Sequence, residues 1–194
     1  MRSAVDAERP VFYYDLGSPD CYLVAETIMA GLPVVPEWEP VLGAALGAGL
    51  GGLDREQIER RAGELELQPI RWPGVWPPDT REAMLAATYA KRVGRAVAFS
   101  LAAFRQAFAG GRDLGDRDTV LIAAAACEMH PTAVLKGIGL RSVVDALGEA
   151  VERARSAGVR SVPAIQVGGQ VLDGDRCVDA AAEALGARPR GLTA

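Results

Sequence analysis

The sequence is poor in the residues that build redox and metal sites. Its 194 residues include three cysteines and one histidine, and no two cysteines form a Cys-x-x-Cys pair. The wide spacing of Cys21, Cys127 and Cys177 indicates free thiols in a reducing compartment rather than a disulfide framework. His130, beside Pro131, has too few partners for a zinc cluster and nothing ties it to a serine nucleophile. We therefore predict no metal site and interpret His130 as a helix-end residue.

Long apolar runs and clusters of basic residues are also absent. The 21 basic and 25 acidic side chains give a net charge of −4, and the sequence has no basic run interleaved with aromatic residues. Nucleic acid is therefore not an expected partner. No stretch approaches the roughly 18 apolar residues of a membrane span, and residues 1–15 lack the apolar segment of a secretory signal. We expect a globular cytoplasmic protein with no membrane partner.

The first pattern that is present is that of a β-α-β unit. Residues 11–16 (VFYYDL) are a short β-branched and aromatic run, and residues 33–40 (PVVPEWEP) are a second. Between these runs, Ser18 suits the cap of a helix and Pro19 suits its first position. Pro36 removes a backbone donor from the second strand, which we therefore place at the edge of the sheet.

The middle of the chain has helical periodicity, and strand patterns return near the end. Five helical segments are predicted between residues 43 and 158: 53–65, 79–94 with the capping box Asp79-x-x-Glu82, 95–111, 116–129 and 140–158. Strands follow at 162–167 and 170–173, joined by the hairpin signal Gly168-Gly169, and a last helix covers 175–186. The order is β-α-β, then helices, then β-β-α.

Four segments in this order resemble one known family. They are "FYYDLGSPDCYL", similar to a Phe-x-Asp-x-x-Ser-Pro-x-x-Tyr-Leu pattern; the Pro-rich "WPGVWPPDT" before a helix; "GVRSVPAIQVGG", similar to a Gly-Val-x-x-Val-Pro segment; and "DGDRC", similar to a Gly-x-Asp-Arg turn. The chain resembles the DsbA-like branch of the thioredoxin superfamily, and within it the 2-hydroxychromene-2-carboxylate isomerases and kappa-class glutathione transferases. The last motif departs from the family pattern, because Gly174 directly precedes Asp175.

The resemblance implies an α/β thioredoxin-like fold whose β-α-β and β-β-α halves share a four-stranded sheet. Residues 1–42 and 159–194 are then one discontinuous thioredoxin-like domain, and residues 43–158 are an all-helical domain inserted into it. The resemblance further implies a small electrophile as the substrate and glutathione, or another low-molecular-weight thiol, as the cofactor.

Ser18 stands where a thioredoxin-like oxidoreductase carries its attacking cysteine. A helix N-terminus stabilises an anion, so this position can hold the thiolate of a soluble thiol when the protein itself supplies no sulfur. In the family this serine is held to donate a hydrogen bond to the glutathione thiolate, which lowers the pKa of that thiol. Taken alone, Ser-Pro at a helix start is an ordinary capping pair, so a structural role for Ser18 stays open.

Cys21 and Pro163 are the next two candidates. Cys21 takes the place of the resolving cysteine, and it is either a packed apolar residue or a thiol able to form a mixed disulfide. The resemblance predicts that the Val162–Pro163 bond is cis and faces the helix start, where the backbone of Val162 pairs with a bound thiol or peptide. The alternative is an ordinary trans proline that begins a strand.

The remaining candidates are predicted to bind the γ-glutamyl unit of the cofactor and the electrophilic substrate. Asp173 and Asp175 are predicted to bind the α-amino group of a γ-glutamyl unit, with the N–H of Gly174 on its carboxylate, although Asp175 is equally explained as a helix cap. Trp72 and Trp76 lie in a stiff loop that we expect over the cleft, where they suit a planar substrate; core filling explains them as well.

Three hypotheses of function follow from the residues and the resemblance. The first is an enzyme that uses a low-molecular-weight thiol to isomerise or conjugate a small electrophile. The second is a DsbA-like thiol-disulfide oxidoreductase acting through Cys21 alone, which the missing first cysteine disfavours. The third is a non-catalytic thioredoxin-fold module that binds peptides through the Pro163 edge. The sequence leaves open whether the chain pairs into a homodimer.

Overall fold

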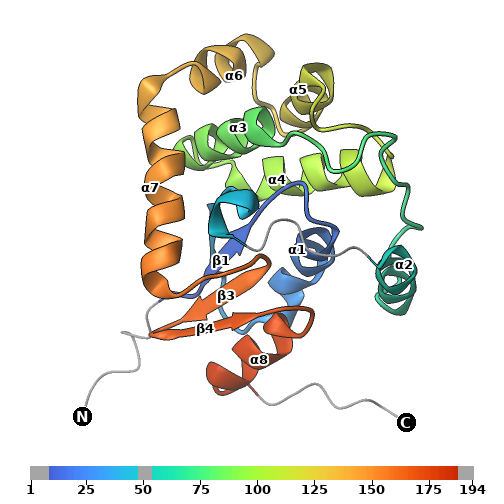
Figure 1. Ribbon diagram of the computed structural model, residues 1–194, viewed down its shortest axis with the longest axis vertical. Helices are drawn as coiled ribbons and strands as arrows, with labels where there is room; N and C mark the ends of the chain where they lie inside the picture. The colour runs from blue at the N-terminus through green and yellow to red at the C-terminus, as the bar shows by residue number, and fades with distance from the viewer. Residues whose placement is uncertain (1–8, 48–53, 188–194) are drawn as a thin grey trace.

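One mixed sheet forms the centre of the molecule (Figure 1). The computed structural model describes residues 9–47 and 54–187. The strands are β1 (Val11–Tyr14), β2 (Glu37–Pro40), β3 (Ala164–Val167) and β4 (Gln170–Asp173), in the order β2-β1-β3-β4. β2 is parallel to β1, whereas β3 is antiparallel to both β1 and β4. The predicted four-stranded thioredoxin-like sheet and the edge position of β2 are confirmed.

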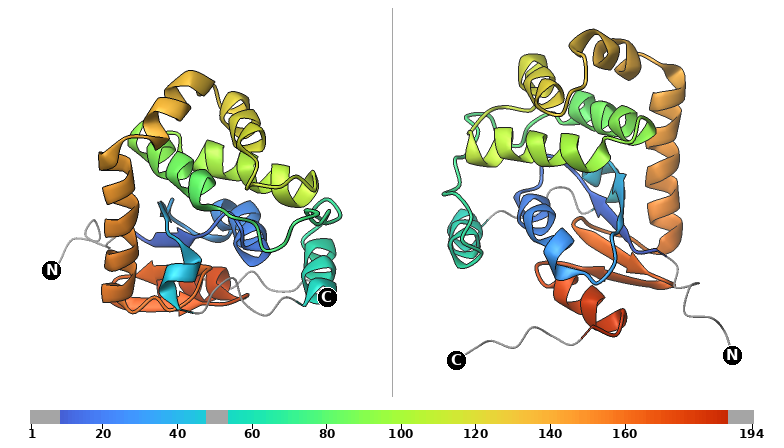
Figure 2. Two further views of the ribbon diagram at one scale, coloured as in Figure 1. Left: turned by 45° about the horizontal axis from the view of Figure 1, so that its top comes forward. Right: turned by 180° about the vertical axis from the view of Figure 1, so that it is seen from behind.

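The two faces of the sheet are covered by different helices because successive side chains of a strand point to opposite sides. Phe12 and Ile165 join the larger core, which also holds residues of α1 (Pro19–Gly31) and α8 (Cys177–Ala184). Tyr13 and Ala164 join a smaller core with α7 (Arg141–Ala157). Figure 1 and the view from behind in Figure 2 agree that α8 lies below the sheet and α7 runs along its side.

The helical segments between β2 and β3 lie above the sheet and beside it (Figure 2). They are the 3-10 turn η1 (Gly43–Leu46), α2 (Arg55–Glu64), α3 (Arg81–Arg92), α4 (Ala96–Phe104), the π-helical turn η2 (Arg105–Ala109), α5 (Arg117–Ala126), α6 (Pro131–Ile138) and α7. The larger core includes Phe12 from the sheet and Phe99 and Phe104 from α4. Division of the chain at residues 42 and 159 stays a prediction.

Several local predictions about the helices need correction. The capping box at residue 79 is wrong: Thr80 precedes α3 without a side-chain capping bond, and Glu82 instead pairs with Arg117 at 2.6 Å. α6 was not predicted, but His130 is the helix-end residue expected, since its Nδ1 accepts the N–H of Thr132 at 3.2 Å. The segment 95–111 is a helix that widens into η2 rather than one continuous α-helix. Position 53 of the predicted helix 53–65 lies outside the described residues.

Two further features concern membranes and metals. No helix in the described ranges has both the length and the apolar character needed to cross a bilayer. Within those same ranges, no three His, Cys, Asp or Glu side chains come together as metal ligands.

Close packing of α1 on α8 depends on Gly31. A Cβ added to Gly31 would lie 2.4 Å from Val178 Cγ1, so either the Val178 side chain or the two helices would have to shift. We expect Gly31→Ala to lower the free energy of unfolding by about 1–3 kcal/mol, measured by urea titration. Adding Val178→Ala should recover part of that loss, because the clash is removed.

Gly148 in the exposed middle of α7 is the matched control. A Cβ there has nothing within 4 Å. Gly148→Ala should therefore stabilise the protein by about 0.5–1 kcal/mol through helix propensity. Equal effects at the two glycines would contradict the packing argument.

Candidate functional site

Ser18 caps α1 as predicted. Its Oγ accepts the N–H of Cys21 at 3.2 Å, its own N–H donates to the Asp15 carbonyl at 3.1 Å, and Pro19 is the first helical residue. The hydroxyl proton is not used by the bond to Cys21, because the oxygen is the acceptor there. Ser18 is buried, with 2% of its surface exposed. Its hydroxyl proton therefore remains for a second acceptor, which is the Cys21 thiol unless an anion is bound, and it has little access to solvent.

Asp15, three residues before Ser18, is a buried carboxylate that sequence reasoning missed. Only 2% of its surface is exposed. Oδ1 accepts the N–H of Gly17 at 2.9 Å, Oδ2 accepts the N–H of Gly43 at 2.8 Å, and the Thr80 side chain adds a third hydrogen bond. Burial raises the pKa of Asp15, and these hydrogen bonds partly offset that effect.

The Val162–Pro163 peptide bond is cis, as predicted. The antiparallel register pairs Tyr13 with Ala164, so Pro163 comes beside the carboxyl end of β1, which leads into Ser18. Val162 contacts the turn that follows β2: a Cβ on Gly43 would lie 3.2 Å from Val162 Cγ2. The structure thus brings the predicted proline segment to the same end of the sheet as the start of α1.

The turn before α8 lies against this proline. The Pro163 carbonyl accepts the N–H of Gly174 at 3.3 Å, and Asp173 accepts the Ser161 hydroxyl at 3.4 Å. Gly174 has a φ of +80°, a conformation that favours glycine. The capping alternative for Asp175 is wrong, because Arg176 precedes α8 and no side chain caps that helix.

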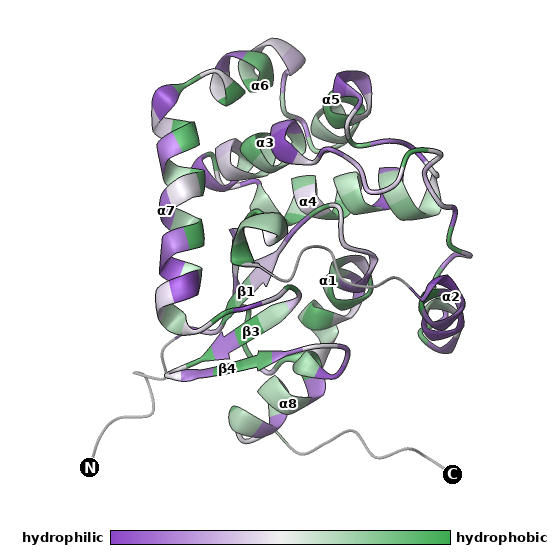
Figure 3. Cartoon of the chain, viewed as in Figure 1, coloured by the Kyte–Doolittle hydropathy of each residue, from purple (hydrophilic) through white to green (hydrophobic). Residues whose placement is uncertain are grey.

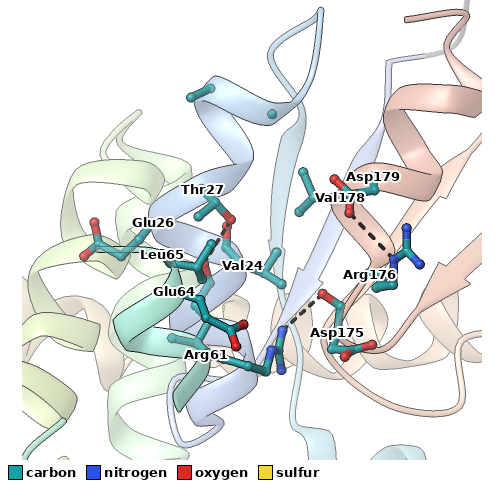
Figure 4. A pocket seen from close by; sticks show the side chains of 13 residues that line it. Val24, Glu26, Thr27, Arg61, Glu64, Leu65, Asp175, Arg176, Val178 and Asp179 are labelled. Atoms are coloured by element: carbon teal, nitrogen blue, oxygen red, sulfur yellow. Dashed lines mark hydrogen bonds and ion pairs between the residues drawn. The ribbon is translucent and has the colours of Figure 1, made fainter. Parts of the chain in front are cut away.

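Arg61 of α2 joins the start of α1 to that turn. Its guanidinium contacts the Asp20 carboxylate at 2.7 Å. It also donates to the Asp175 carbonyl at 3.1 Å, as Figure 4 shows. The Asp20 side chain is 37% exposed and the Arg61 side chain 15% exposed. The negative charge of Asp20 is therefore balanced beside the helix N-terminus rather than left alone there.

A pocket of about 510 Å³ extends from Arg61 along α1, between α2 and α8 (Figure 4). Leu23 and Val24 of α1 and Val178 of α8 give it apolar walls, and charged side chains such as Glu64 and Asp175 line it as well. Of the predicted cofactor-binding residues, Asp175 lines this pocket, whereas Val162, Pro163, Asp173 and Gly174 are not among its lining residues.

Trp72 and Trp76 are partly buried members of an aromatic cluster. Their rings pack edge to face with centroids 5.8 Å apart, and both contact Phe108 of η2, which stacks on Tyr22 of α1 at 5.6 Å. Neither tryptophan lines the pocket along α1. Trp72 also holds α2, since its Nε1 donates to Glu59 at 2.6 Å. Substrate binding by the two tryptophans stays a prediction.

Comparison with known proteins identifies the family. Residues 54–186 match the family model of the DSBA-like thioredoxin domain. The chain belongs to the DSBA-like thioredoxin family. A comparison with curated proteins found no match.

Solved structures share the fold of this DSBA-like chain over most of their length. A 2-hydroxychromene-2-carboxylate isomerase superposes with a TM-score of 0.79 at 16% identity, covering 91% of this chain and 94% of its own. A probable DsbA oxidoreductase from Streptomyces coelicolor gives 0.72 at 18% identity, covering 91% and 88%. The cytosolic disulfide reductase DsbM from Pseudomonas aeruginosa, in a structure with GSH, gives 0.65 at 15% identity, covering 92% and 96%.

The cysteines of this DSBA-like chain are all buried. Burial raises the pKa of Cys21 well above its usual value, with a hydrogen bond from the Ser18 side chain partly offsetting it. Burial also raises the pKa of Cys127, and that of Cys177 to about 12. Because the thiolate is the nucleophile, a raised pKa lowers the reactive fraction at neutral pH.

We expect these thiols to be inert in the folded protein. A chromogenic disulfide reagent at about pH 8 should label native protein far more slowly than it labels free glutathione, because burial both hides the thiols and raises their pKa. Unfolding in guanidinium should release all three thiols. One thiol that reacts at the rate of glutathione in the native protein would refute this and restore Cys21 as a candidate nucleophile.

Proposed function

We propose that this protein binds a low-molecular-weight thiol of the glutathione type at Ser18 and uses it to isomerise or conjugate a small electrophile. The observation that carries the proposal has two parts. A serine stands at the redox position, and all three cysteines are buried and have a raised pKa. The chain supplies a hydrogen-bond donor at the helix start but no accessible thiolate. The sulfur nucleophile therefore has to come from a bound molecule.

The residues around Ser18 suit such a sulfur. The positive end of α1 favours an anion, and the Ser18 hydroxyl can donate its proton to that anion in place of the Cys21 thiol. Arg61 holds the carboxylate of Asp20 at 2.7 Å, which reduces its repulsion of a nearby thiolate. These contacts lower the pKa of a thiol bound there and increase the fraction of nucleophile at neutral pH.

When bound, the thiol supplies a sulfur that adds to an activated double bond and then either leaves after rotation or stays in the product. The protein contributes the Ser18 donor, the backbone of Val162 for pairing, and a site that is shielded from water. Because Ser18 is 2% exposed, neighbouring side chains have to move aside to admit the thiol. The free cysteines fit a reducing cytoplasm, where such thiols are abundant.

The names of two neighbours support the proposal without carrying it. One neighbour is an isomerase and another is a disulfide reductase in a structure with GSH. At 16% and 15% identity they share the fold with this chain, and the fold alone permits several activities. A DsbA-like oxidoreductase acting through Cys21 is the weaker candidate, since that thiol is 0% exposed.

A thermal-shift screen of low-molecular-weight thiols tests the first step. A thiol at about 100 times its Kd should stabilise the protein by about 2.7 kcal/mol, whereas the matching S-methyl compound should stabilise it less because it cannot form a thiolate. If no thiol shifts the melting temperature, the non-catalytic module becomes the better description.

Ser18→Ala should weaken the proposed site without unfolding the protein. Loss of the cap costs about 1 kcal/mol of stability. Loss of the hydroxyl donor should raise the pKa of the bound glutathione thiol by about one pH unit. The ultraviolet absorbance of the thiolate, titrated against pH, measures this. Asp116→Ala is the control, because Asp116 caps the distant α5 through the N–H of Asp118. Equal thiol pKa values in the Ser18 variant and the wild type would reduce Ser18 to a helix cap.

Ser18→Cys should give the chain a dithiol that it lacks. The new thiol would sit at the start of α1 with Cys21 one turn later, where the Ser18 side chain already hydrogen-bonds the Cys21 thiol. We expect this variant to form an internal disulfide and to reduce insulin, because backbone N–H groups lower the pKa of a thiol at a helix N-terminus. Mass spectrometry detects the disulfide as a loss of two hydrogens. Failure of both tests would mean that the fold no longer supports redox chemistry at this position.

A further inference from the structure

Three chain segments that are distant in sequence meet at the Asp15 carboxylate. Its oxygens accept the N–H of Gly17 at 2.9 Å, in the loop before Ser18, and the N–H of Gly43 at 2.8 Å, at the start of η1. The side chain of Thr80, next to α3, supplies another hydrogen bond. The first of these segments leads directly into Ser18, which caps α1.

Gly43 connects the carboxylate to the proline segment. A Cβ on Gly43 would lie 3.4 Å from Asp15 Oδ2 and 3.2 Å from Val162 Cγ2, so η1 is packed tightly between the two. Val162 is the residue before the cis proline. The position of Val162 relative to Ser18 is thus set by contacts that run through Gly43 and Asp15.

No counter-charge accompanies this buried carboxylate. Asp15 makes no ion pair among those found in the described residues, and no charged group contributes to its raised pKa. The other titratable groups influenced by its charge are Tyr14 and Cys21. A buried charge without a partner is costly, and it is tolerated here because several donors point at it. In return, the carboxylate holds the N–H groups of Gly17 and Gly43 in place.

We propose that Asp15 is the positioning residue of the thiol site, fixing the Ser18 loop against η1 and Val162 so that a thiol fits between them. This rests on the proposed function. The Asp15 carboxylate is too buried to be a direct ligand, so it acts through Gly17 and Gly43.

Asp15→Asn is the direct test, because it keeps the size of the side chain. One carboxylate oxygen becomes an NH₂ group that faces a backbone N–H, so one of the two glycine bonds is lost. We expect glutathione to bind about tenfold more weakly, by isothermal calorimetry, and the pKa of the bound thiol to rise. A purely electrostatic role of Asp15 predicts the opposite sign, since removal of a negative charge lowers the pKa of a neighbouring thiol.

Asp113→Asn is the matched control. Asp113 Oδ1 accepts the N–H of Gly115 at 2.8 Å in the same two-residue geometry as Asp15 and Gly17, but in the loop before α5. The Asp113→Asn substitution should leave both the Kd for glutathione and the pKa of the bound thiol unchanged. Gly43→Ala tests the same contacts independently, because its Cβ presses on Val162 and Asp15. This variant should also weaken the binding of glutathione, and it keeps the test available if Asp15→Asn fails to fold.

The outcomes separate this proposal from the function on which it rests. If the wild type binds neither glutathione nor any other thiol, the proposed function is overturned, and this inference with it. Wild-type binding with an unchanged Kd in the variants that fold, or a lowered thiol pKa in Asp15→Asn, overturns the positioning role alone. Weaker binding and a raised thiol pKa, with Asp113→Asn unaffected, support it.

Discussion

A buried carboxylate needs donors, and meeting that need at Asp15 organises the end of the sheet where α1 begins. The loop between β1 and α1 has its backbone N–H groups satisfied one by one: Leu16 donates to Met84 Sδ at 3.2 Å, Gly17 to the Asp15 carboxylate and Ser18 to the Asp15 carbonyl. Since a buried polar group without a partner is costly, the loop cannot move far without losing these bonds. The start of α1 is therefore held by the sheet, by η1 and by α3 together.

The attachment of α2 is of a different kind. Figure 3 colours α2 mostly as hydrophilic, and its buried residues are Ile58 and Ala62. Polar and aromatic contacts hold it as well, through Arg61 on Asp20, Glu59 on Trp72 and the Arg55 guanidinium 4.9 Å from the Trp72 ring centre. Surface and partly buried contacts of this type are individually weak. The attachment of α2 thus depends more on such contacts than does the loop before α1, which is held by buried hydrogen bonds.

The proposed chemistry follows from which group stands at the start of α1. In this fold a cysteine at the helix start is activated by the helix N-terminus, but here a hydroxyl takes that place and Cys21 is turned into the core. A hydroxyl at a helix N-terminus cannot become a comparable nucleophile at neutral pH, yet it remains a good donor to an anion. Exchange of one atom, sulfur for oxygen, thus changes what the site can hold rather than how the chain folds.

The local patterns of the sequence predicted the elements and the order of the chain. Alternating residues such as Phe12 and Tyr13 specify a strand with two covered faces, and the pair Ser18-Pro19 specifies where α1 begins, because these signals act within a few residues. Contacts between distant segments carry no such signal. The burial of Asp15 and the pairing of Arg61 with Asp20 arose only when η1 and α2 were brought against α1. The sequence alone therefore determined the fold family and the serine at the helix start, whereas the tertiary structure decided which charges surround that serine and how far it is buried.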